Sequence, residues 1–548
     1  MRAVRGGPYR RSVAFVVERH CTAARGVVVE NKGHPRRWAI LAVLAVAVFV
    51  VSIDSTVLNV ALPTLGREFG AGTGELQWMV DAYSVALAGL LLMAGSLSDR
   101  FGRKKLLLIG LLLFGAASVA AAFSAETWQL IAARAVMGAG ASAFMPGTLS
   151  ILVHVFSDEE RPKAIGVWGA VTALGAVTGP LIGGVLLEHF WWGSLYLVNV
   201  VVVAAAVLGA AVLVPESTDP AAHPLDPVST VLSVVGVTGL VYGVIEQPRF
   251  GWSSSEVLTG LIGGAVVMVL FFVRQATARH PMIDLTVVRN RRFLGSSGTM
   301  AVLMFALTGS LFVLTQQFQL VLGYSPLLSG AAILPVAVAL MVCSPLSPVV
   351  AKAIGVRNTV VLSLLVLAAG YGVYAEFTEE YGYGAMVVAM ALVGTGMGLS
   401  QPLVNDVLMT AGPPEQSGLL SSMNDTVQEM GAAFGVAVVG SVLAARYAAT
   451  YAPHDPAAPA TRSLDQALEA AHGLPQAAGR ATVEAAKSAF AQSFSASAAV
   501  CAGVVVLGAV AAAVLLPATL RAAGEAEADG DTAVVAGVPA RAAGKGTA

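Results

Sequence analysis

The chain has 548 residues, of which 56% are hydrophobic and only 12% are charged, with a formal net charge of −1. Soluble domains average about 25% charged residues, so this composition predicts a polytopic membrane protein rather than a set of soluble domains. The near-zero net charge gives no indication of nucleic-acid binding, and three scattered cysteines make neither a disulfide framework nor a metal site. We therefore expect no metal and no cofactor.

Membrane-spanning helices need roughly 20 mostly apolar residues each, and the chain contains fourteen such runs. They lie at residues 38–59, 77–98, 104–123, 128–152, 163–187, 193–214, 228–246, 257–274, 294–320, 326–349, 357–376, 384–409, 418–445 and 494–516. Residues 1–36 are basic and lack the apolar core of a cleaved signal peptide, so we expect a cytoplasmic tail. The Ala- and Gly-rich residues 517–548 predict a disordered tail on the same side.

The distribution of basic residues predicts the orientation. Most of the 32 Lys and Arg fall in segments on the same side as the N-terminal tail. The positive-inside rule therefore places both termini in the cytoplasm of a cell-membrane protein. The long loop at 446–493 is then external. It contains two helical patterns, LDQALEAA and ATVEAAKSAF, and we expect a solvated hairpin there, the alternative being a loop that faces the substrate.

An internal repeat divides the chain. Residues 138–184 align without gaps with residues 394–440, so that Gly138 matches Gly394 and Gly179 matches Gly435. The repeat relates a first six-helix half, residues 37–214, to a second one, residues 293–516. Residues 215–292 remain as a linker with two inserted spans. Two six-helix halves related by an axis along the membrane normal are typical of transporters whose substrate site lies between the halves. We therefore predict an all-α transporter fold with two extra helices.

Two buried charges stand out in the first half. The first span ends in SIDSTVLNVALP and contains Asp54, and the fourth span, LIAARAVMGAGASAFMPG, contains Arg134 at a similar depth. A charge inside the membrane costs about 2.5–3.5 kcal/mol even on the lenient insertion scale, so it normally faces a cavity or a partner. We expect the two to pair, either as a protonatable carboxylate controlled by Arg134 or as a purely structural ion pair. The repeat places Met390 opposite Arg134, so the basic residue is confined to one half.

The thirteenth span carries two acidic residues. Asp425 and Glu429 are four residues apart and therefore share a helix face. Two carboxylates on one face cannot both ionise cheaply in a low-dielectric site, which suits proton carriage. The same face could attract a cationic substrate, or hold solvated residues at the cytoplasmic mouth. The other polar candidates are Asn59, Asp406 and Asn424 at the cavity or mouth, and Asp81, which we expect at the external interface.

The loop after the second span reads GSLSDRFGRKKLLLIG, residues 95–110. Its candidates for a conformational or gating motif are Gly95, Asp99, Arg100, Gly102, Arg103 and Lys104. The glycines permit a tight turn, the basic residues anchor the cytoplasmic face, and Asp99 can cap the next helix or pair with Arg103 or a moving helix end. The counterpart at 344–358 has no acidic residue, so an Asp-based latch belongs to the first half alone.

The fifth span contains GAVTGPLIGG, residues 175–184. Its small residues predict a groove for close helix packing, and its proline predicts a kink. The residues concerned are Gly175, Gly179, Pro180, Gly183 and Gly184.

These motifs resemble those of a known family. The loop at 95–105 resembles the signature loop of the major facilitator superfamily, and the motif of the fifth span resembles one typical of its antiporters. With DSTVLNVALP at 54–63 and Arg134 beside Gly138, the chain resembles the fourteen-helix drug:proton antiporters of the EmrB/QacA type over residues 38–516. The resemblance implies coupling roles for Asp54 and Arg134, and for Glu429 or Asp425. The stretch WWGSLYLVN at 191–199 lacks the Arg found there in many members.

The resemblance implies a monomeric multidrug exporter that uses the proton gradient to move hydrophobic or cationic compounds out of the lipid bilayer or cytoplasm. A dedicated exporter of a self-made antibiotic, siderophore or amphiphile is the alternative. A membrane channel, receptor or enzyme is disfavoured. The chain has no G-x-x-x-x-G-K-[ST] loop, which argues against ATP-driven transport, and no H-E-x-x-H sequence or nucleophile elbow of an enzyme. The two-half repeat argues for rocking of the halves rather than a static pore. We therefore expect a transporter and not an enzyme.

Overall fold

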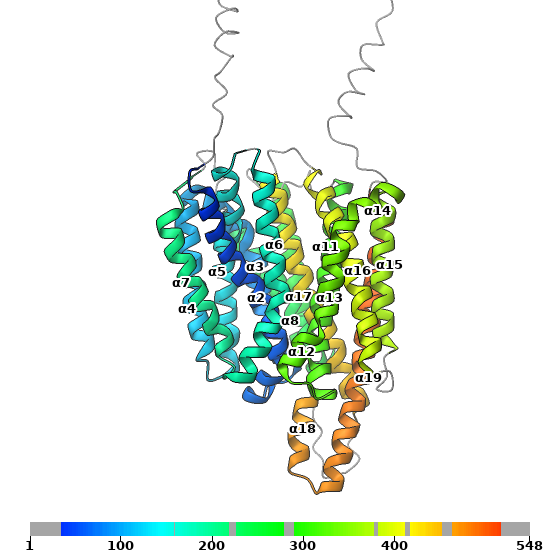
Figure 1. Ribbon diagram of the computed structural model, residues 1–548. Helices are drawn as coiled ribbons and strands as arrows, with labels where there is room; N and C mark the ends of the chain where they lie inside the picture. Colours follow the sequence, from blue (N-terminus) through cyan, green and yellow to red (C-terminus); the bar gives the residue numbers. More distant parts are fainter. Residues whose placement is uncertain are drawn as a thin grey trace, which may run out of the picture.

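The computed structural model describes residues 34–157, 159–218, 226–278, 290–376, 382–411, 417–451 and 463–516. Regular structure in these ranges is entirely helical (Figure 1). Thirteen helical spans among them are long and apolar enough to cross a membrane. The remaining expected span is α3 (Thr73–Phe101), which has 29 residues and packs inside the bundle against α5 and α17. Its first turns are polar, and this lowers its hydropathy.

The helices form two bundles with a pair of helices beside them. The first half contains α2 (Arg37–Phe69), α3, α4 (Arg103–Ala122), α5 (Thr127–Val155), α6 (Arg161–His189) and α7 (Ser194–Leu213). The inserted pair is α8 (Pro227–Phe250) and α9 (Ser255–Thr277). The second half contains α11 (Arg291–Gln316), η1 (Gln317–Val321), α12 (Pro326–Ala332), α13 (Leu334–Cys343), η2 (Ser344–Leu346), α14 (Ser347–Ile354), α15 (Val356–Ala375), α16 (Gly382–Met409), α17 (Ser417–Thr450), α18 (Leu464–His472) and α19 (Gln476–Leu515).

The tenth predicted span, 326–349, is not one continuous helix. The structure divides this stretch into α12, α13, η2 and α14 and extends it to Ile354. Each of the four pieces begins with a proline at its first or second position. Proline lacks the backbone N–H that would continue the helix, so these repeated prolines account for the breaks.

The last span begins much earlier than predicted. Helix α19 starts at Gln476 rather than at residue 494 and continues for 40 residues. Its first turns are rich in alanine, the residue with the highest helix propensity. Figure 1 shows these turns and α18 projecting together beyond the bundle. We call this pair the hairpin, and the end of the bundle from which it projects the hairpin end.

Glycine contacts show the repeat in three dimensions. A Cβ atom at Gly138 of α5 would lie 2.3 Å from the Tyr83 carbonyl oxygen of α3, and one at Gly394 of α16 would lie 2.2 Å from the Val336 carbonyl oxygen of α13. In the same way, α6 packs against α2 and α17 packs against α11. Matching glycines therefore bring equivalent helix pairs into backbone contact in both halves.

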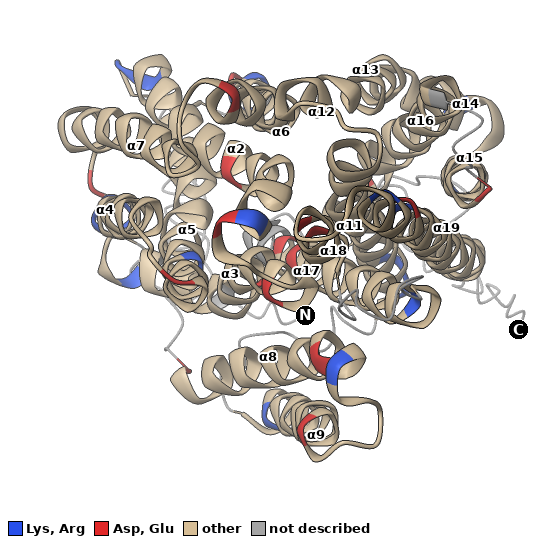
Figure 2. Ribbon diagram, turned by 90° about the horizontal axis from the view of Figure 1, so that it is seen from below, with Lys and Arg blue, Asp and Glu red and all other residues tan. Residues whose placement is uncertain are grey.

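The inserted helices α8 and α9 stand together outside the two halves (Figure 2). Helix α8 packs against α3 and α17. At the start of α8, Asp226 accepts hydrogen bonds from the Arg274 guanidinium of α9, at 2.8 Å, and from the Ser229 hydroxyl, at 2.6 Å. Burial raises the pKa of Asp226, but these hydrogen bonds outweigh it and hold the pKa at about 2. The ion pair and hydrogen bonds of Asp226 therefore hold the start of α8 against the end of α9.

The two halves are hydrogen-bonded to each other at the hairpin end. Gln77, in the second turn of α3, donates from Nε2 to the carbonyl oxygens of Val436 at 3.0 Å and Ala437 at 2.8 Å on α17. Gln319 of η1 donates to the Val60 carbonyl oxygen of α2 at 2.7 Å. The structure is thus a state in which the halves are closed together at this end.

Candidate functional site

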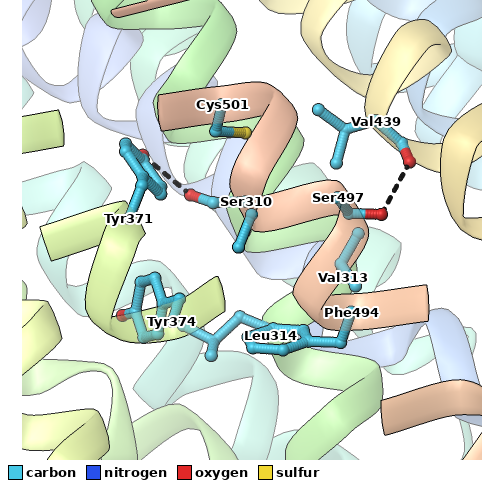
Figure 3. Close-up of a pocket in the computed structure, with 10 residues that line it drawn as sticks. Ser310, Val313, Leu314, Tyr371, Tyr374, Val439, Phe494, Ser497 and Cys501 are labelled. Carbon is cyan, nitrogen blue, oxygen red and sulfur yellow. Dashed lines mark hydrogen bonds between the residues drawn. The ribbon is translucent and has the colours of Figure 1, made fainter. Parts of the chain in front are cut away.

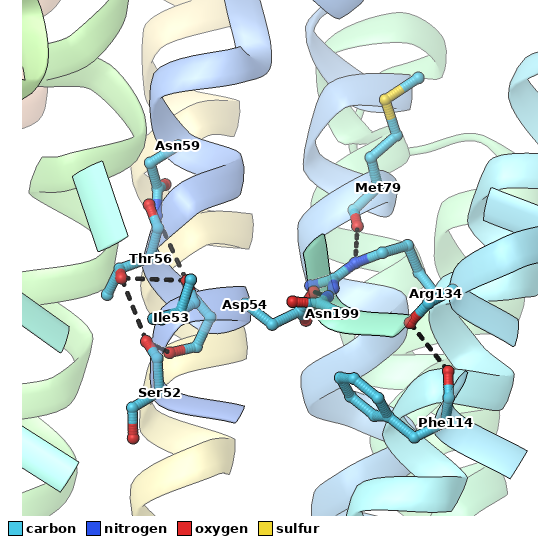
Figure 4. Close-up of polar contacts among 11 residues, drawn as sticks. Ser52, Ile53, Asp54, Thr56, Asn59, Met79, Phe114, Arg134 and Asn199 are labelled. Atoms are coloured by element: carbon cyan, nitrogen blue, oxygen red, sulfur yellow. Dashed lines mark hydrogen bonds and ion pairs between the residues drawn. The ribbon is translucent and has the colours of Figure 1, made fainter. Parts of the chain in front are cut away.

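Asp54 lies in the interior of the first half, with only 1% of its surface exposed. Its Oδ2 forms an ion pair with an Nη atom of Arg134 on α5, and its Oδ1 accepts a hydrogen bond from the Asn199 amide of α7 at 2.8 Å (Figure 4). The predicted pairing of Asp54 with Arg134 is therefore confirmed. Three helices position this carboxylate, and both of its oxygens have partners.

Arg134 has contacts that do not involve Asp54. Its Nε donates to the Met79 carbonyl oxygen of α3 at 3.0 Å, and its guanidinium lies over the Tyr83 ring, 4.5 Å from the centroid. A desolvated cation–π contact of this kind is worth about 2 kcal/mol. Arg134 can thus stay in place when the charge of Asp54 changes.

Asn199 is a member of this site that the sequence analysis missed. The signal was a single amide in the apolar run LYLVNVVVV, but nothing in that run shows which helix the amide faces. Three buried polar atoms near the ion pair have no hydrogen-bond partner in the described part of the chain: Asn199 Oδ1 and the hydroxyls of Tyr83 and Tyr196. Water typically satisfies such atoms, so the surroundings of Asp54 suit a hydrated path for protons.

The second half contributes Glu429 of α17 to the same region. Glu429 is half-buried; Ser84 of α3 hydrogen-bonds its carboxyl group, and Arg134 is close enough to act on its charge. Asp425, one turn earlier, is also half-buried, and Gln428 Nε2 donates a long hydrogen bond to its Oδ1, at 3.5 Å. The structure therefore brings Glu429 to the ion pair more closely than Asp425.

The other polar candidates occupy different surroundings. Asp406 is exposed, as expected at a mouth. Asn59 is buried, and its amide makes only long hydrogen bonds, at 3.5 Å, to carbonyl oxygens of its own helix. Asn424 is buried, and its Oδ1 has no hydrogen-bond partner among the described residues.

Asp81 is not interfacial, and that expectation was wrong. It is completely buried, and neither carboxylate oxygen has a hydrogen-bond partner within the part of the chain that the structure describes. It lies one turn after Gln77, on the face of α3 that meets α17 and α8. Helix α8 covers this face, and the sequence could not show where α8 packs. An unpaired buried carboxylate is costly, so Asp81 is a further candidate for protonation.

The loop motif docks onto the segment after α7. Gly102 joins α3 to α4 with φ of 115°, a conformation that favours glycine. A Cβ there would also lie 2.5 Å from Glu216 Oε1. Lys104 donates from its backbone N–H to Glu216 and from Nζ to the Ala211 carbonyl oxygen at 2.7 Å. Arg103 donates its N–H to the Ser217 carbonyl oxygen at 3.0 Å. The motif thus ties α4 to the end of α7, while the Asp99 side chain lies outside the described residues.

The glycine motif of α6 has contacts on two sides. Its first three glycines face α2. A Cβ at Gly175 would lie 2.7 Å from Ser52 Cβ, and one at Gly179 would lie 2.1 Å from Thr56 Oγ1. A Cβ at Gly183 would lie 2.6 Å from Val57 Cγ2. On the other side, a Cβ at Gly184 would lie 2.5 Å from Leu327 Cα of α12, and one at Gly330 would lie 2.3 Å from the Pro180 carbonyl oxygen. The motif therefore packs α6 onto its own half and onto the other half at the hairpin end.

A small cavity inside the second half is no substrate site. It is lined by residues such as Ser310, Tyr371 and Cys501, and the hydroxyls of Ser310 and Tyr371 lie 3.1 Å apart (Figure 3). Its volume is about 10 Å³, enough for about one water molecule. Binding sites for drug-sized molecules measure about 300–1,000 Å³.

Comparisons with known proteins agree with this geometry. A family model described as the Major Facilitator Superfamily matches residues 44–436. The chain is 34% identical to the multidrug efflux pump LfrA of Mycolicibacterium smegmatis over 86% of this chain and 94% of that protein. It is also 34% identical to the methyl viologen resistance protein SmvA of Salmonella typhimurium, over 83% and 93%. A solved bacterial homologue of the human lysosomal transporter Spinster aligns with a TM-score of 0.59 and 17% identity, over 87% and 98%, which supports the fold alone.

Proposed function

The chain belongs to the Major Facilitator Superfamily, and from that premise we propose that it is a multidrug exporter that exchanges hydrophobic or cationic compounds for protons. Relatives named as a multidrug efflux pump and a methyl viologen resistance protein support this substrate class. The proposal needs no cofactor, because the proton gradient supplies the energy.

The observation that carries the proposal is the buried pair of Asp54 and Arg134, with Glu429 of the other half beside it. A proton that reaches Asp54 removes its charge and weakens its attraction to Arg134. Arg134 keeps its contacts to Met79 and Tyr83, so its charge then acts more strongly on Glu429 across the interface. Protonation of one half can thereby change the interaction between the halves.

We place both termini in the cytoplasm, so that the hairpin end faces outward. The hydrogen bonds of Gln77 and Gln319 then close the external side, and the described state is one that loads substrate from the cytoplasm or inner leaflet. Separation of these contacts would release the substrate outward and admit protons to Asp54, as alternating access requires.

The test is an efflux assay in a bacterial host that lacks its own major exporters. Cells that express the chain should accumulate less ethidium and methyl viologen than control cells, and a protonophore should abolish the difference. Normal accumulation across a panel of dyes, biocides and antibiotics, with the protein present in the membrane, would refute multidrug export. Protection against a single antibiotic would favour the dedicated exporter instead.

A further inference from the structure

A second and much larger cavity runs along the hairpin, from its base beside α2 to the turn between α18 and α19. Its volume is about 750 Å³, within the range of about 300–1,000 Å³ for small-molecule sites. Its walls come from the end of α2, from η1, from α18 and from the first turns of α19. None of the residues that line it belongs to the Asp54 site, so it is a different place from the site described above.

Asp465, in the first turn of α18, lines this cavity. Only 8% of its surface is exposed, and its Oδ1 has no hydrogen-bond partner among the described residues. Its Oδ2 approaches α2 where Gly66 leaves room, since a Cβ at Gly66 would lie 2.9 Å from that oxygen. A buried carboxylate oxygen without a hydrogen-bond partner is costly unless a proton or a cation satisfies it.

The rest of the lining shows what kind of cation fits. The apolar residues of the wall are Leu320, Leu468, Leu474 and Val483, together with Ala471. The other charged or titratable residues that face the cavity are Arg67 of α2, Glu469 and His472 of α18, and Arg480 and Glu484 of α19. All five are exposed and therefore screened by solvent. The lining is therefore mixed, with a buried carboxylate and apolar side chains in one wall, and this combination suits a cation with an apolar body rather than a small hydrated ion.

We propose that the hairpin cavity is a binding site for an organic cation, with Asp465 as its counter-ion. The site does not rest on the proposed function, because binding there requires no transport. Burial raises the pKa of Asp465 to about 7, although Arg67 acts to lower it. Because the proton and the organic cation then compete for the same carboxylate, binding should weaken as the pH falls below about 7.

The test uses purified full-length protein in nanodiscs, where both faces are accessible. Val483→Cys places a thiol in the cavity wall, in a background whose native cysteines are replaced. A trimethylammonium methanethiosulfonate and a sulfonate methanethiosulfonate are compared, with each rate divided by its rate with a free thiol. The cationic reagent should react faster, tetraphenylphosphonium should slow it, and lowering the pH from 8 to 5.5 should reduce the preference.

The counter-ion is tested by Asp465→Asn, which should cut the preference for the cationic reagent by about tenfold, equivalent to about 1.4 kcal/mol. The matched control is Glu188→Gln, which removes the same charge from an exposed position of α6 outside the cavity and should leave the preference unchanged. Equal rates for the two reagents, or no protection by tetraphenylphosphonium, would overturn the proposal. These two results need no Asp465 variant, so a variant that misfolds cannot obscure them.

Discussion

Replacing Asp54 by asparagine separates the two roles that the buried ion pair can have. The side chain keeps its shape, and one oxygen remains to accept the hydrogen bond from Asn199. The charge disappears, however, so Arg134 is left as a buried cation without its counter-charge. If Asp54 is protonated during transport, the substitution imitates that state permanently. Proton-driven export should then be lost, while exchange of substrate across the membrane without a gradient should continue.

The magnitude follows from the surroundings of the pair. Two unit charges about 4 Å apart attract by about 4 kcal/mol at an effective dielectric constant of about 20. The hydrogen bond from Asn199 also weakens from a charge-assisted to a neutral one, by about 1 kcal/mol. The contacts of Arg134 to Met79 and Tyr83 remain and offset part of the loss. We therefore expect Asp54→Asn to destabilise the protein by about 3–5 kcal/mol, as is usual when one partner of a buried pair is removed.

The decisive comparison adds Arg134→Gln to Asp54→Asn. The double variant leaves no buried charge at this place, so it should recover most of the stability lost by Asp54→Asn, measured as the apparent melting temperature in detergent. It should not recover proton-driven export, because the protonatable carboxylate is still missing. Recovery of both stability and proton-driven export would show that the pair is purely structural and would refute the coupling role.

Three further substitutions test the contacts around the site. Gly179→Ala would place a Cβ 2.1 Å from Thr56 Oγ1, so it should destabilise the protein by about 1–3 kcal/mol and reduce efflux. The control is Gly169→Ala on the same helix, whose Cβ would meet nothing within 4 Å and which should change neither stability nor efflux. Equal effects of the two substitutions on the melting temperature would contradict the packing argument. Gln77→Leu removes two short hydrogen bonds between the halves and a third, long one to Ser441. Loss of the two short ones should shift the population toward the state open at the hairpin end by roughly 5- to 150-fold. Spin labels on the two halves would report this shift as longer distances, and an unchanged distance distribution would count against this gate. Asp226→Asn should cost about 1.5–3 kcal/mol. The pKa of Asp226 is lowered from 3.8 to about 2, so its contribution to stability is complete above about pH 4 and is lost as the pH falls through about 2. The loss of stability in Asp226→Asn should therefore be constant from pH 5 to 8. A loss that varies with pH in this range would contradict the assignment.

The pairing of Asp54 with Arg134 could be predicted because it depends only on the depth of the two residues in the membrane. Fourteen spans and the orientation rule place both residues at the same level of the membrane, and a buried charge requires a partner. Backbone contact between matching glycines was predictable for the same kind of reason, since small residues in register mark close helix packing.

Asn199 and Asp81 could not be placed in this way, because their roles depend on which helix covers which face. For Asp81 the covering helix is α8, which belongs to neither repeat and so has no counterpart from which to infer its position. The two helices of the hairpin were predicted, but the sequence did not show that the second one continues into the last span, because a helix that projects from the membrane has no apolar pattern to mark its beginning. Alanine propensity alone extends α19 to Gln476.

Proton movement coupled to substrate tests the central claim most directly. Purified protein is placed in liposomes with an acid interior, which contain a pH-sensitive dye, and tetraphenylphosphonium is added outside. The account predicts that the interior pH rises when the wild-type protein takes up the cation. In liposomes preloaded with unlabelled cation, Asp54→Asn should exchange it for labelled external cation without this rise. Uptake of the cation by the wild-type protein with no change in interior pH would contradict it.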